Sequence, residues 1–311
     1  MAYDTGGDPM RQLKWCRTTP AKIAQQLRRV GIHVGATTVR RLLKQLGYAL
    51  RVNHKKVEAG TRNPPHPKQR DQQFDHIGAL RKSFADHGDP IISVDTKKKD
   101  LIGNFKNGGR AWKEKATPVY DHDFPSDAVG RMVPFGIYDT QANHGFVSVG
   151  TSKDTPAFAV DSIQQWWHQE GIARYPNAAR LLILADCGGS NSARSRVWKY
   201  RMQQQLCDTH GLTVTVCHYP PGTSKWNPIE HRLFSEISKR WAGEPLRTFA
   251  TALHFIRTTT TEAGLRVTAR FSRKKYNTGD KVTKAQMDAL CLSRYQPLPD
   301  WNYILTPSAK M

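Results

Sequence analysis

The chain has 311 residues, with 47 Lys and Arg against 26 Asp and Glu, and a formal net charge of +21. This length allows a main domain with its own hydrophobic core plus smaller modules, and the charge favours a polyanionic partner, nucleic acid first. No stretch approaches the roughly 18 apolar residues of a membrane-spanning helix, and residues 1–20 lack a signal-peptide core, so we expect a soluble, cytoplasmic protein without membrane association.

The N-terminal part of the chain predicts a small helical module. Residues 1–16 are polar and show no periodic pattern, so we expect a flexible N-terminus. The segment 17–57 carries two short helical patterns, one with Thr19 as N-cap before Pro20 and one with Thr37 as N-cap. Apolar residues recur at helical spacing in both, which predicts an all-α helix-turn-helix module.

This module is the most basic part of the chain. Residues 1–57 hold 12 Lys or Arg and only two acidic residues. The open face of the second helix would present Arg40, Arg41 and Lys44, which suit contacts with DNA phosphates. The alternative is a solvated helical hairpin that does not bind DNA.

Residues 58–88 are expected to connect this module to the rest of the chain. The stretch 58–68 has three prolines among its last five positions and predicts a semi-rigid linker at a domain boundary. The stretch 70–88 has apolar residues at helical spacing and predicts one helix that stops at Gly88.

Residues 89–243 alternate short apolar runs with helical patterns. Strands are predicted at 90–96, 133–140, 144–150, 179–186 and 212–218, and helices at 155–171, 192–210 and 228–241. Three leading strands followed by alternating helices and strands predict a mixed sheet with helices on both faces, because parallel strands need crossover helices. This α/β element order is that of the ribonuclease H fold.

Two regions fall outside this alternation. Residues 97–131 are rich in Lys, Gly and Asn and predict a basic surface insertion between the first two strands. Residues 244–311 form an accessory region, with helices expected near 246–262 and 284–292 and a basic run between them. The pattern assigns no role to this region.

Three acidic residues stand at matching ends of the predicted elements. Asp95 and Asp186 end buried strands, and Glu230 lies in the first turn of the last helix. The carboxyl ends of parallel strands gather at one sheet edge, so we expect Asp95 and Asp186 to be neighbours within reach of Glu230. Convergent carboxylates favour Mg²⁺ or Mn²⁺, and two such ions could support phosphodiester chemistry.

Other acidic residues fail this test of position. Asp139 ends a strand that runs antiparallel to the first, so it should lie at the opposite edge and is interpreted as structural. Asp154 is interpreted as a helix N-cap. Taken singly, Asp95 and Asp186 could be loop-start residues and Glu230 a first-turn acid favoured by the helix dipole. Their joint occurrence in fold order favours a site.

The motifs "VDTKKK", "LLILADCGGSN" and "PPGTSKWNPIEHRLF" carry a resemblance that spans about residues 8–304. They resemble the DDE transposases of bacterial insertion sequences, specifically the Rhodopirellula-type family. The resemblance implies that Asp95, Asp186 and Glu230 are the DDE triad of a ribonuclease H-like domain, with 90 and 43 residues between them. Such enzymes use two Mg²⁺ ions, with Mn²⁺ as a substitute, to cut transposon ends and let the freed 3′-hydroxyl attack target DNA.

The resemblance suggests further site residues and partners. Asn191 and Asn227 could each orient a catalytic carboxylate or a phosphate, although Asn227 could equally be only an N-cap. Phosphate contacts, or alternatively only a solvated basic loop, are expected at Lys97, Lys98, Lys99 and Lys225. The implied partners are double-stranded DNA, as transposon ends and target, and a second copy of the chain in the complex that joins two ends.

The chain departs from the family pattern at two places. Cys187 stands where the family usually has the first of three glycines, and it would be strained if that position needs a positive φ. The family usually carries another helix-turn-helix upstream of the position of Met1, so we expect an N-terminally short copy. The alternatives are an inactive transposase remnant that only binds DNA, and a ribonuclease H-like nuclease without strand transfer.

Overall fold

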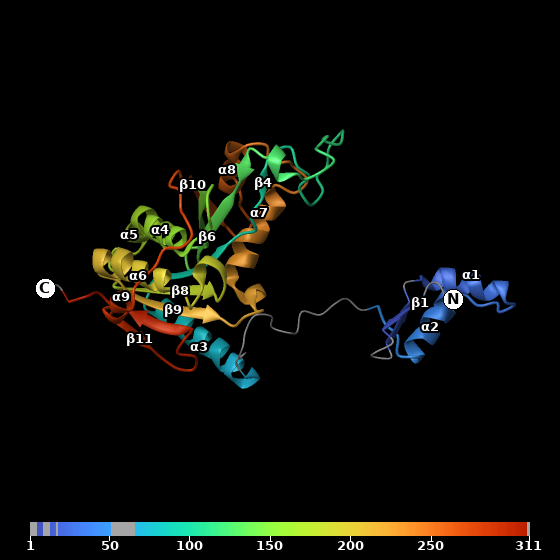
Figure 1. The fold of residues 1–311 in the computed structure, drawn as a ribbon, viewed down its shortest axis with the longest axis horizontal. Helices are drawn as coiled ribbons and strands as arrows, with labels where there is room; N and C mark the ends of the chain where they lie inside the picture. Colours follow the sequence, from blue (N-terminus) through green and yellow to red (C-terminus); the bar gives the residue numbers. More distant parts are fainter. Residues whose placement is uncertain (1–4, 9–12, 17, 51–65, 310–311) are drawn as a thin grey trace. The chain divides into compact units, whose positions relative to one another are not determined.

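The computed structural model describes residues 5–8, 13–16, 18–50 and 66–309 (Figure 1). The chain divides into two compact units, Met1–Lys56 and Val57–Met311, next to the boundary expected after residue 57. Most of the predicted Pro-rich linker lies outside the described residues. None of the helices in the described ranges is long and apolar enough to cross a membrane.

The first unit contains a strand pair and two helices. The two strands pair antiparallel in a segment where the sequence pattern predicts no regular element. The two predicted helices are present. Their bounds and those of the strands are β1 (Thr5–Asp8), β2 (Leu13–Cys16), α1 (Pro20–Arg29) and α2 (Ala36–Gln45).

The helices of this unit begin at different kinds of cap. Thr19 caps α1 as predicted, and its hydroxyl accepts the N–H of Lys22 at 3.4 Å. Gly35 is the N-cap of α2, so Thr37 lies inside that helix and is not its cap. The small core between the helices consists of Ile23, Ala24, Leu27, Val34, Val39 and Leu43.

The second unit is built on an eight-stranded mixed sheet with the order β10-β7-β6-β3-β8-β9-β12-β11. The strands are β3 (Ile91–Thr96), β6 (Val133–Asp139), β7 (His144–Gly150), β8 (Arg180–Asp186), β9 (Thr213–Tyr219), β10 (Arg266–Phe271), β11 (Leu292–Arg294) and β12 (Asn302–Leu305). β6 lies antiparallel between β3 and β7, and β8 and β9 run parallel to β3. This arrangement of the five central strands is ribonuclease H-like and confirms the predicted fold class.

The C-terminal region completes this sheet. β10 adds to one edge beside β7, and β12 and β11 add to the other edge beside β9. The sequence pattern predicts only helices in residues 244–311. The sequence pattern does not reveal these three strands because they are short and lie at or next to the sheet edges, and β10 mixes buried and exposed residues.

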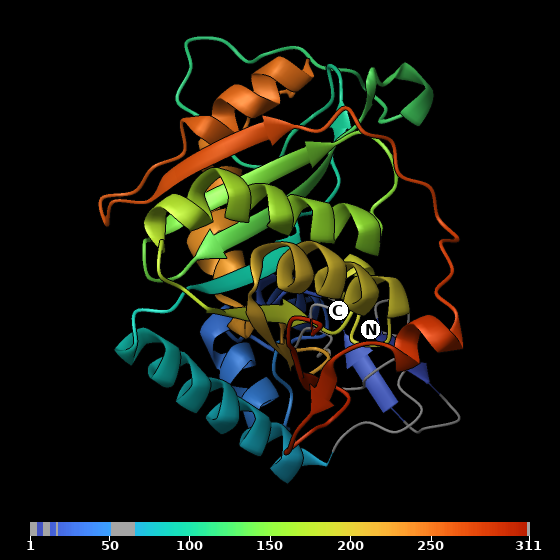
Figure 2. The ribbon, with the colours of Figure 1, turned by 90° about the vertical axis from the view of Figure 1, so that its left-hand side faces the viewer.

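Helices cover both faces of the sheet. On one face, α4 (Pro156–Trp166) lies beside α6 (Arg196–Met202), as Figure 2 shows. The other face is covered by α3 (Pro67–Asp86), by the π-helix η6 (Glu230–Phe234), which continues as α7 (Ser235–Arg240), and by α8 (Phe249–Arg257). The remaining elements are short: β4 (Leu101–Ile102), β5 (Gly130–Arg131), η1 (Pro125–Asp127), η2 (Trp167–Gly171), α5 (Ile172–Arg174), η3 (Gly189–Asn191), η4 (Gln203–Asp208), η5 (Ser224–Trp226) and α9 (Lys284–Asp288).

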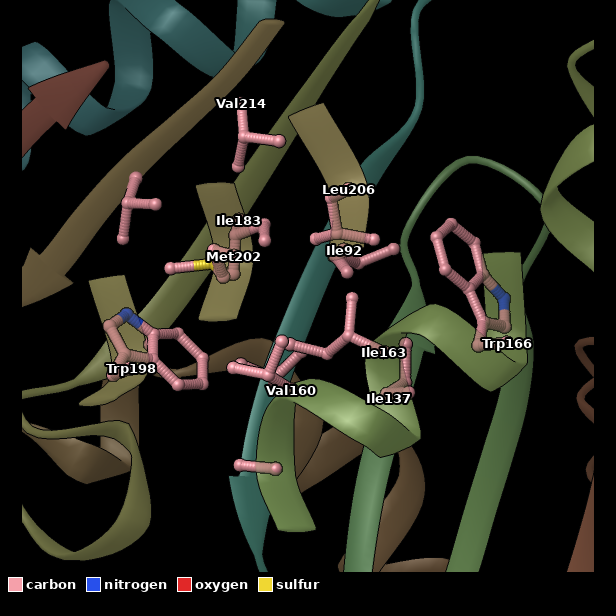
Figure 3. Packing of buried hydrophobic residues seen from close by; sticks show 14 of the residues in the cluster. Ile92, Ile137, Val160, Ile163, Trp166, Ile183, Trp198, Met202, Leu206 and Val214 are labelled. Atoms are coloured by element: carbon pink, nitrogen blue, oxygen red, sulfur yellow. The ribbon is translucent and has the colours of Figure 1, made fainter. Parts of the chain in front are cut away.

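The main core fixes which face each strand residue uses. Ile92 and Ile183 point from the sheet toward Val160 of α4 and Trp198 of α6 (Figure 3). Since side chains alternate along a strand, the residues on either side of Ile92 point to the opposite face, under α3 and η6. Ser93 lies in that second layer.

Two glycines let η6 approach the sheet closely. A Cβ at Gly136 of β6 would lie 2.4 Å from the Phe234 ring, and one at Gly145 of β7 would lie 2.4 Å from Leu233. Gly136 pairs with Asp95 in the sheet register. The missing side chain at Gly136 therefore allows the helix that begins at Glu230 to pack next to Asp95.

Candidate active site

Asp95 and Asp186 lie side by side at the carboxyl ends of parallel strands. Val94 of β3 pairs with Ala185 of β8, so the next position in the register brings the two aspartates together. Alternation along both strands directs their side chains to the face that α3 and η6 cover. The structure thus brings together the first two carboxylates of the predicted triad.

Glu230 is the first residue of η6 and joins this pair. Its N–H donates to the carbonyl of Asn227 at 3.1 Å, which closes the turn before the helix. Its side chain is within hydrogen-bonding reach of Asp95 and has an electrostatic interaction with Asp186. All three carboxylates predicted from the sequence therefore interact with one another.

Burial and mutual repulsion dominate the electrostatics of these groups. Burial, followed by the charge of Asp186, raises the pKa of Asp95 to about 8, against a hydrogen bond from the Thr96 N–H at 2.7 Å. Burial also raises the pKa of Asp186 to about 6, with a further contribution from Glu230. Burial raises the pKa of Glu230, although the charge of Lys97 opposes this shift. The raised pKa values mean that the positive charge around these carboxylates is too small to stabilise all three in the ionised form.

Each aspartate receives a hydrogen bond from an asparagine amide. Asn191 Nδ2 donates to Asp95 Oδ1 at 3.3 Å, and Asn227 Nδ2 donates to Asp186 Oδ1 at 3.1 Å. Among the described residues no side chain caps η6, so the side chain of Asn227 contacts the carboxylate instead of capping the helix. Asn191 Oδ1 is buried without a hydrogen-bond partner in the described part of the chain.

Ser93 is a polar residue of this site that the sequence analysis missed. It is fully buried on β3, two residues before Asp95 and on the same face. Its hydroxyl donates a short hydrogen bond to Asn227 Oδ1 and accepts the N–H of Ile229 at 3.2 Å. One hydroxyl therefore ties the strand of Asp95 to the turn that precedes Glu230. A serine in a strand that is otherwise apolar is the signal that could have identified it.

A buried chain of hydrogen bonds supports Asp186 from the other side. The ring of His218 lies 3.0 Å from the Asp186 carbonyl through Nδ1 and 3.2 Å from the Tyr303 hydroxyl through Nε2. Burial lowers the pKa of His218 to about 4, so the ring is neutral and Nδ1 carries the proton that the carbonyl accepts. Trp198 Nε1 donates to the Tyr303 hydroxyl at 2.8 Å. These hydrogen bonds hold the end of β8 in place and therefore fix the backbone of Asp186.

A pocket of about 690 Å³ opens beside the two aspartates. Lys98, Lys99 and Arg194 line it, and all three are exposed. Lys225 is also exposed, with its Nζ 5.2 Å from the Trp226 ring centre. Three of the four predicted lysines therefore remain accessible to a phosphate.

Lys97 has a different environment from these lysines. It is 9% exposed, and its Nζ lies 3.7 Å from Asp100 Oδ2 and 4.7 Å from the centre of the Trp241 ring. Burial lowers its pKa, while the charges of Asp100 and Glu230 act in the opposite direction. These contacts favour a role in stabilising the acidic cluster over a contact with a DNA phosphate.

Asp154 belongs to the pocket and is not a helix cap. Thr155 caps α4, because its hydroxyl accepts the N–H of Phe158 at 3.2 Å. Asp154 instead accepts the hydroxyl of Thr96 at 3.1 Å and pairs with Lys99 at 3.1 Å. Thr155 is the N-cap because Pro156 occupies the first helical position, and the cap is the residue directly before that position.

The glycine loop after Asp186 contains no backbone strain at Cys187. Among the described non-glycine residues only Asn143 has a positive φ, whereas Gly189 has a φ of 62°. The Cys187 thiol donates to the carbonyl of Tyr219 at 3.1 Å. The left-handed position of the loop is therefore occupied by a glycine, and the expected strain at Cys187 is absent.

The basic residues predicted for the first unit lie on an open surface. Arg40, Arg41 and Lys44 of α2 are all exposed, while Val39 of the same helix is buried against α1. Their side chains are therefore accessible to a partner of this unit.

The donor set of the acidic cluster fits a hard divalent cation in its chemistry. Three carboxylates come together from three elements, and burial raises the pKa of each, while Asp186 and Glu230 raise the pKa of Asp95 further. Hard divalent cations prefer such oxygen ligands. As they stand, no three His, Cys, Asp or Glu side chains in the described ranges surround one point closely enough to hold a metal ion.

Comparison with known proteins gives a family for the chain. A sequence profile described as "Rhodopirellula transposase DDE domain" matches residues 1–307. A search of curated protein sequences finds no match. Similar solved structures include a pre-cleavage Mos1 transpososome (TM-score 0.45, 12% identity) and a Mos1 transposase paired-end complex with the left transposon end (TM-score 0.44, 13% identity).

The coverage of these structures is partial. They cover 77% of this chain, and this chain spans only 66% and 65% of the length of theirs.

Proposed function

Because this chain belongs to the Rhodopirellula transposase DDE domain family, we propose that it is a DNA transposase that cuts at insertion-sequence ends and joins the freed 3′-hydroxyl to target DNA. The observation that carries the proposal is the convergence of Asp95, Asp186 and Glu230, from three elements, at the carboxyl edge of the sheet. The partners would be double-stranded DNA, as ends and target, and a second copy of the chain to hold two ends together. Both kinds of DNA would be met in the cytoplasm.

Asp95, Asp186 and Glu230 are the residues that would hold Mg²⁺, with Mn²⁺ as a substitute. Bound there, two such ions would polarise the attacking oxygen and stabilise the leaving oxygen of a phosphodiester. The protein prepares this site by burying the carboxylates and by fixing each aspartate with an asparagine amide. A site positioned in this way loses little free energy to reorganisation during the reaction.

The other polar residues would position the DNA. Lys98 and Lys99 line the pocket beside the acidic cluster, and Lys225 lies exposed in the turn before Glu230, so all three could neutralise backbone phosphates near the cut. In the first unit, Arg40 and Arg41 would contact the DNA of the transposon end through the open face of α2. Cutting therefore depends on the second unit, and we propose that recognition of the end depends on the first.

The test is a cutting and joining assay on duplex DNA that carries the inverted repeats flanking the gene. With Mg²⁺ or Mn²⁺, the wild-type chain should nick the end and join it to target DNA. Glu230→Gln should lose cutting but keep DNA binding. Glu236→Gln is the matched control, because Glu236 lies further along the same helical stretch and pairs with Lys239.

Each rival function gives its own result in this assay. DNA binding without nicking by the wild-type chain would indicate a remnant that only binds DNA. Nicked ends that never join target DNA would indicate a nuclease without strand transfer. Full cutting by the Glu230→Gln variant would remove the proposed site.

A further inference from the structure

The carboxyl end of β10 lies at the same sheet edge as the candidate active site. β10 pairs parallel with β7, β7 antiparallel with β6, and β6 antiparallel with β3. β10 therefore runs in the same direction as β3, and the chain leaves β10 at the edge where Asp95 and Asp186 lie. The segment that follows, residues 272–283, begins at this edge.

This part of the chain is strongly basic and open to solvent. Between residues 270 and 281 there are five Lys or Arg and one acidic residue. Within the described ranges, only one of these cations, Lys274, forms an ion pair, with Asp161 at 2.6 Å. We define the cationic edge as the four exposed cations that have no ion-pair partner there: Arg270, Arg273, Lys275 and Lys281.

The backbone of this segment is fixed against the catalytic domain. Tyr276 is buried, its N–H donates to Ser152 Oγ at 3.0 Å, and its hydroxyl donates to Asp161 Oδ2 at 2.9 Å. The N–H of Ser272 donates to the carbonyl of Val149 at 2.8 Å. These contacts on either side of Arg273 and Lys275 hold the main chain in place while the two cations face solvent.

The segment lines a second pocket that shares Asp154 with the pocket of the aspartates. Residues 277–282 line one side of a second pocket of about 580 Å³, and Asp154 and Arg196 line the other side. Asp154 also lines the active-site pocket and contacts Thr96, the neighbour of Asp95. Arg196 donates to the carbonyl of Val282 at 3.4 Å, which joins the two walls of the second pocket.

We propose that the cationic edge, together with Arg194 and Arg196, is a surface that binds the phosphate backbone of duplex DNA continuing from the active-site pocket. The inference rests on the proposed function, because that function supplies a DNA strand at Asp95 and Asp186. Unpaired cations on a backbone that is held in place bind DNA by releasing its counterions, and this binding does not depend on base sequence. The accessory residues 244–311 thereby acquire a role in holding the DNA that flanks the cut.

The test compares two pairs of cations in the full chain. Arg273→Ser with Lys275→Ser removes two charges from the cationic edge. Arg81→Ser with Lys82→Ser removes two charges near the end of α3, which leads into the start of β3 at the opposite sheet edge. All four side chains are exposed, and the one ion pair among them, Lys82 with Asp86 at 2.6 Å, is a surface pair, so both double variants should keep a melting temperature close to that of the wild type.

Binding is measured by fluorescence anisotropy with a labelled duplex of about 30 base pairs and unrelated sequence, in EDTA, from about 50 to 200 mM salt. For the cationic-edge variant, the slope of log K against log salt should become shallower by about two, one for each lost phosphate contact. The α3 variant should keep the wild-type slope. The Lys281→Ser variant should reduce the slope by about one.

Two results would overturn the inference. One is a wild-type slope in the Arg273 and Lys275 double variant, and the other is an equal loss in the α3 variant, which would assign the effect to net charge alone. Because the buffer contains no divalent metal, this measurement is independent of cutting. Failure of the proposed function would instead show as absence of nicked and joined products in the assay described above.

Discussion

Asp95 and Asp139 end neighbouring antiparallel strands of one sheet but have opposite surroundings. Asp139 is fully buried at the carboxyl end of β6, where the hydroxyl of Tyr175 donates to its Oδ1 at 2.9 Å and Arg174 pairs with its Oδ2 at 3.1 Å. The backbone N–H groups of Gln141 and Ala142 also donate to it, each at 3.1 Å. Its negative charge is therefore compensated by the protein itself.

Asp95, at the other edge of the sheet, is surrounded by acidic groups. Asp186, Glu230 and Asp154 all act to raise its pKa, in addition to burial. Asn191 and the N–H of Thr96 are its hydrogen-bond donors, and both are neutral. The comparison shows that a buried carboxylate paired with its own cation stabilises the fold. A buried cluster of three carboxylates with one buried lysine beside it, Lys97, is arranged for positive charge that comes from outside.

The largest expected effect is the loss of cutting activity when Asp95, but not Asp139, is replaced by Asn. Asp95→Asn should lower metal-dependent cutting by more than about 10³-fold, because residues that act as a unit fail together. Its melting temperature should not fall, because the change removes a buried group repelled by its neighbours.

The matching Asp139→Asn change should lower stability and leave cutting activity nearly unchanged. It should cost about 3 kcal/mol in the free energy of unfolding, because Arg174 loses its fully buried partner and keeps only Glu170. The protein that remains folded should cut at close to the wild-type rate. Urea denaturation and the cutting assay measure both quantities. A similar loss of cutting in both variants would contradict the comparison.

The next effect concerns Ser93, which supports the acidic edge without carrying a charge. Ser93→Ala leaves Asn227 Oδ1 and the Ile229 N–H without their partner, and should weaken Mn²⁺ binding, measured by calorimetry, by about 10- to 100-fold. Ser148→Ala is the matched control, because Ser148 is also buried in a strand but bonds Gln165 away from the cluster. Equal Mn²⁺ affinity in the two variants would show that Ser93 has only a structural role.

Gly136→Ala tests the close approach of the helix that begins at Glu230. The added Cβ would overlap the Phe234 ring and contact Ile229 Cδ1 at 3.0 Å. We expect a loss of about 1–3 kcal/mol in unfolding free energy together with weaker Mn²⁺ binding, because the helix must move away from β6. Gly78→Ala in α3 is the control, because its Cβ would meet open space and should not destabilise the protein.

The smallest effect is a difference in pH dependence in metal-free buffer. Asp95 has a folded-state pKa of about 8 against a reference value of 3.8, so the native state keeps its proton longer and the protein loses stability as pH rises between these values. Burial would raise the pKa of Glu170 at the other edge, but the hydrogen bond and charge of His144 lower it below 4.5 overall. Its contribution is therefore present above pH 4.5 and is lost on further acidification.

The two profiles are measured by urea denaturation across this range. Asp95→Asn should flatten the decline toward pH 8, and Glu170→Gln should leave that decline unchanged. An identical decline in the wild-type and Asp95→Asn proteins would contradict the assigned surroundings of Asp95.

Much of the fold could be predicted because its signals are local. The strands predicted at 90–96 and 179–186 are largely apolar runs with an aspartate at or next to the last position, and their bounds lie close to those of β3 and β8. The convergence of Asp95, Asp186 and Glu230 then follows from strand direction. β10 and β12 are not predicted because these short strands are stabilised by pairing with β7 and β9, which the local sequence does not encode.

The finer features of the site depend on contacts between distant segments. The bond from Ser93 to Asn227 joins residues 134 positions apart, and the burial of Lys97 depends on Trp241. The N-cap of α4 is different, because the Thr-Pro step at 155–156 was visible and is the same signal that identified Thr19. A serine in an apolar strand and a Thr-Pro step are therefore worth examining in other sequences.

The central claim is that Asp95, Asp186 and Glu230 together bind the catalytic metal. The most direct measurement is a crystal structure with Mn²⁺, using anomalous scattering to locate the ions. We predict Mn²⁺ within coordination distance of all three carboxylates, at about 2.0–2.4 Å from their oxygens. Saturating Mn²⁺ without an anomalous peak between these residues, or with a peak that only other residues coordinate, would contradict the claim.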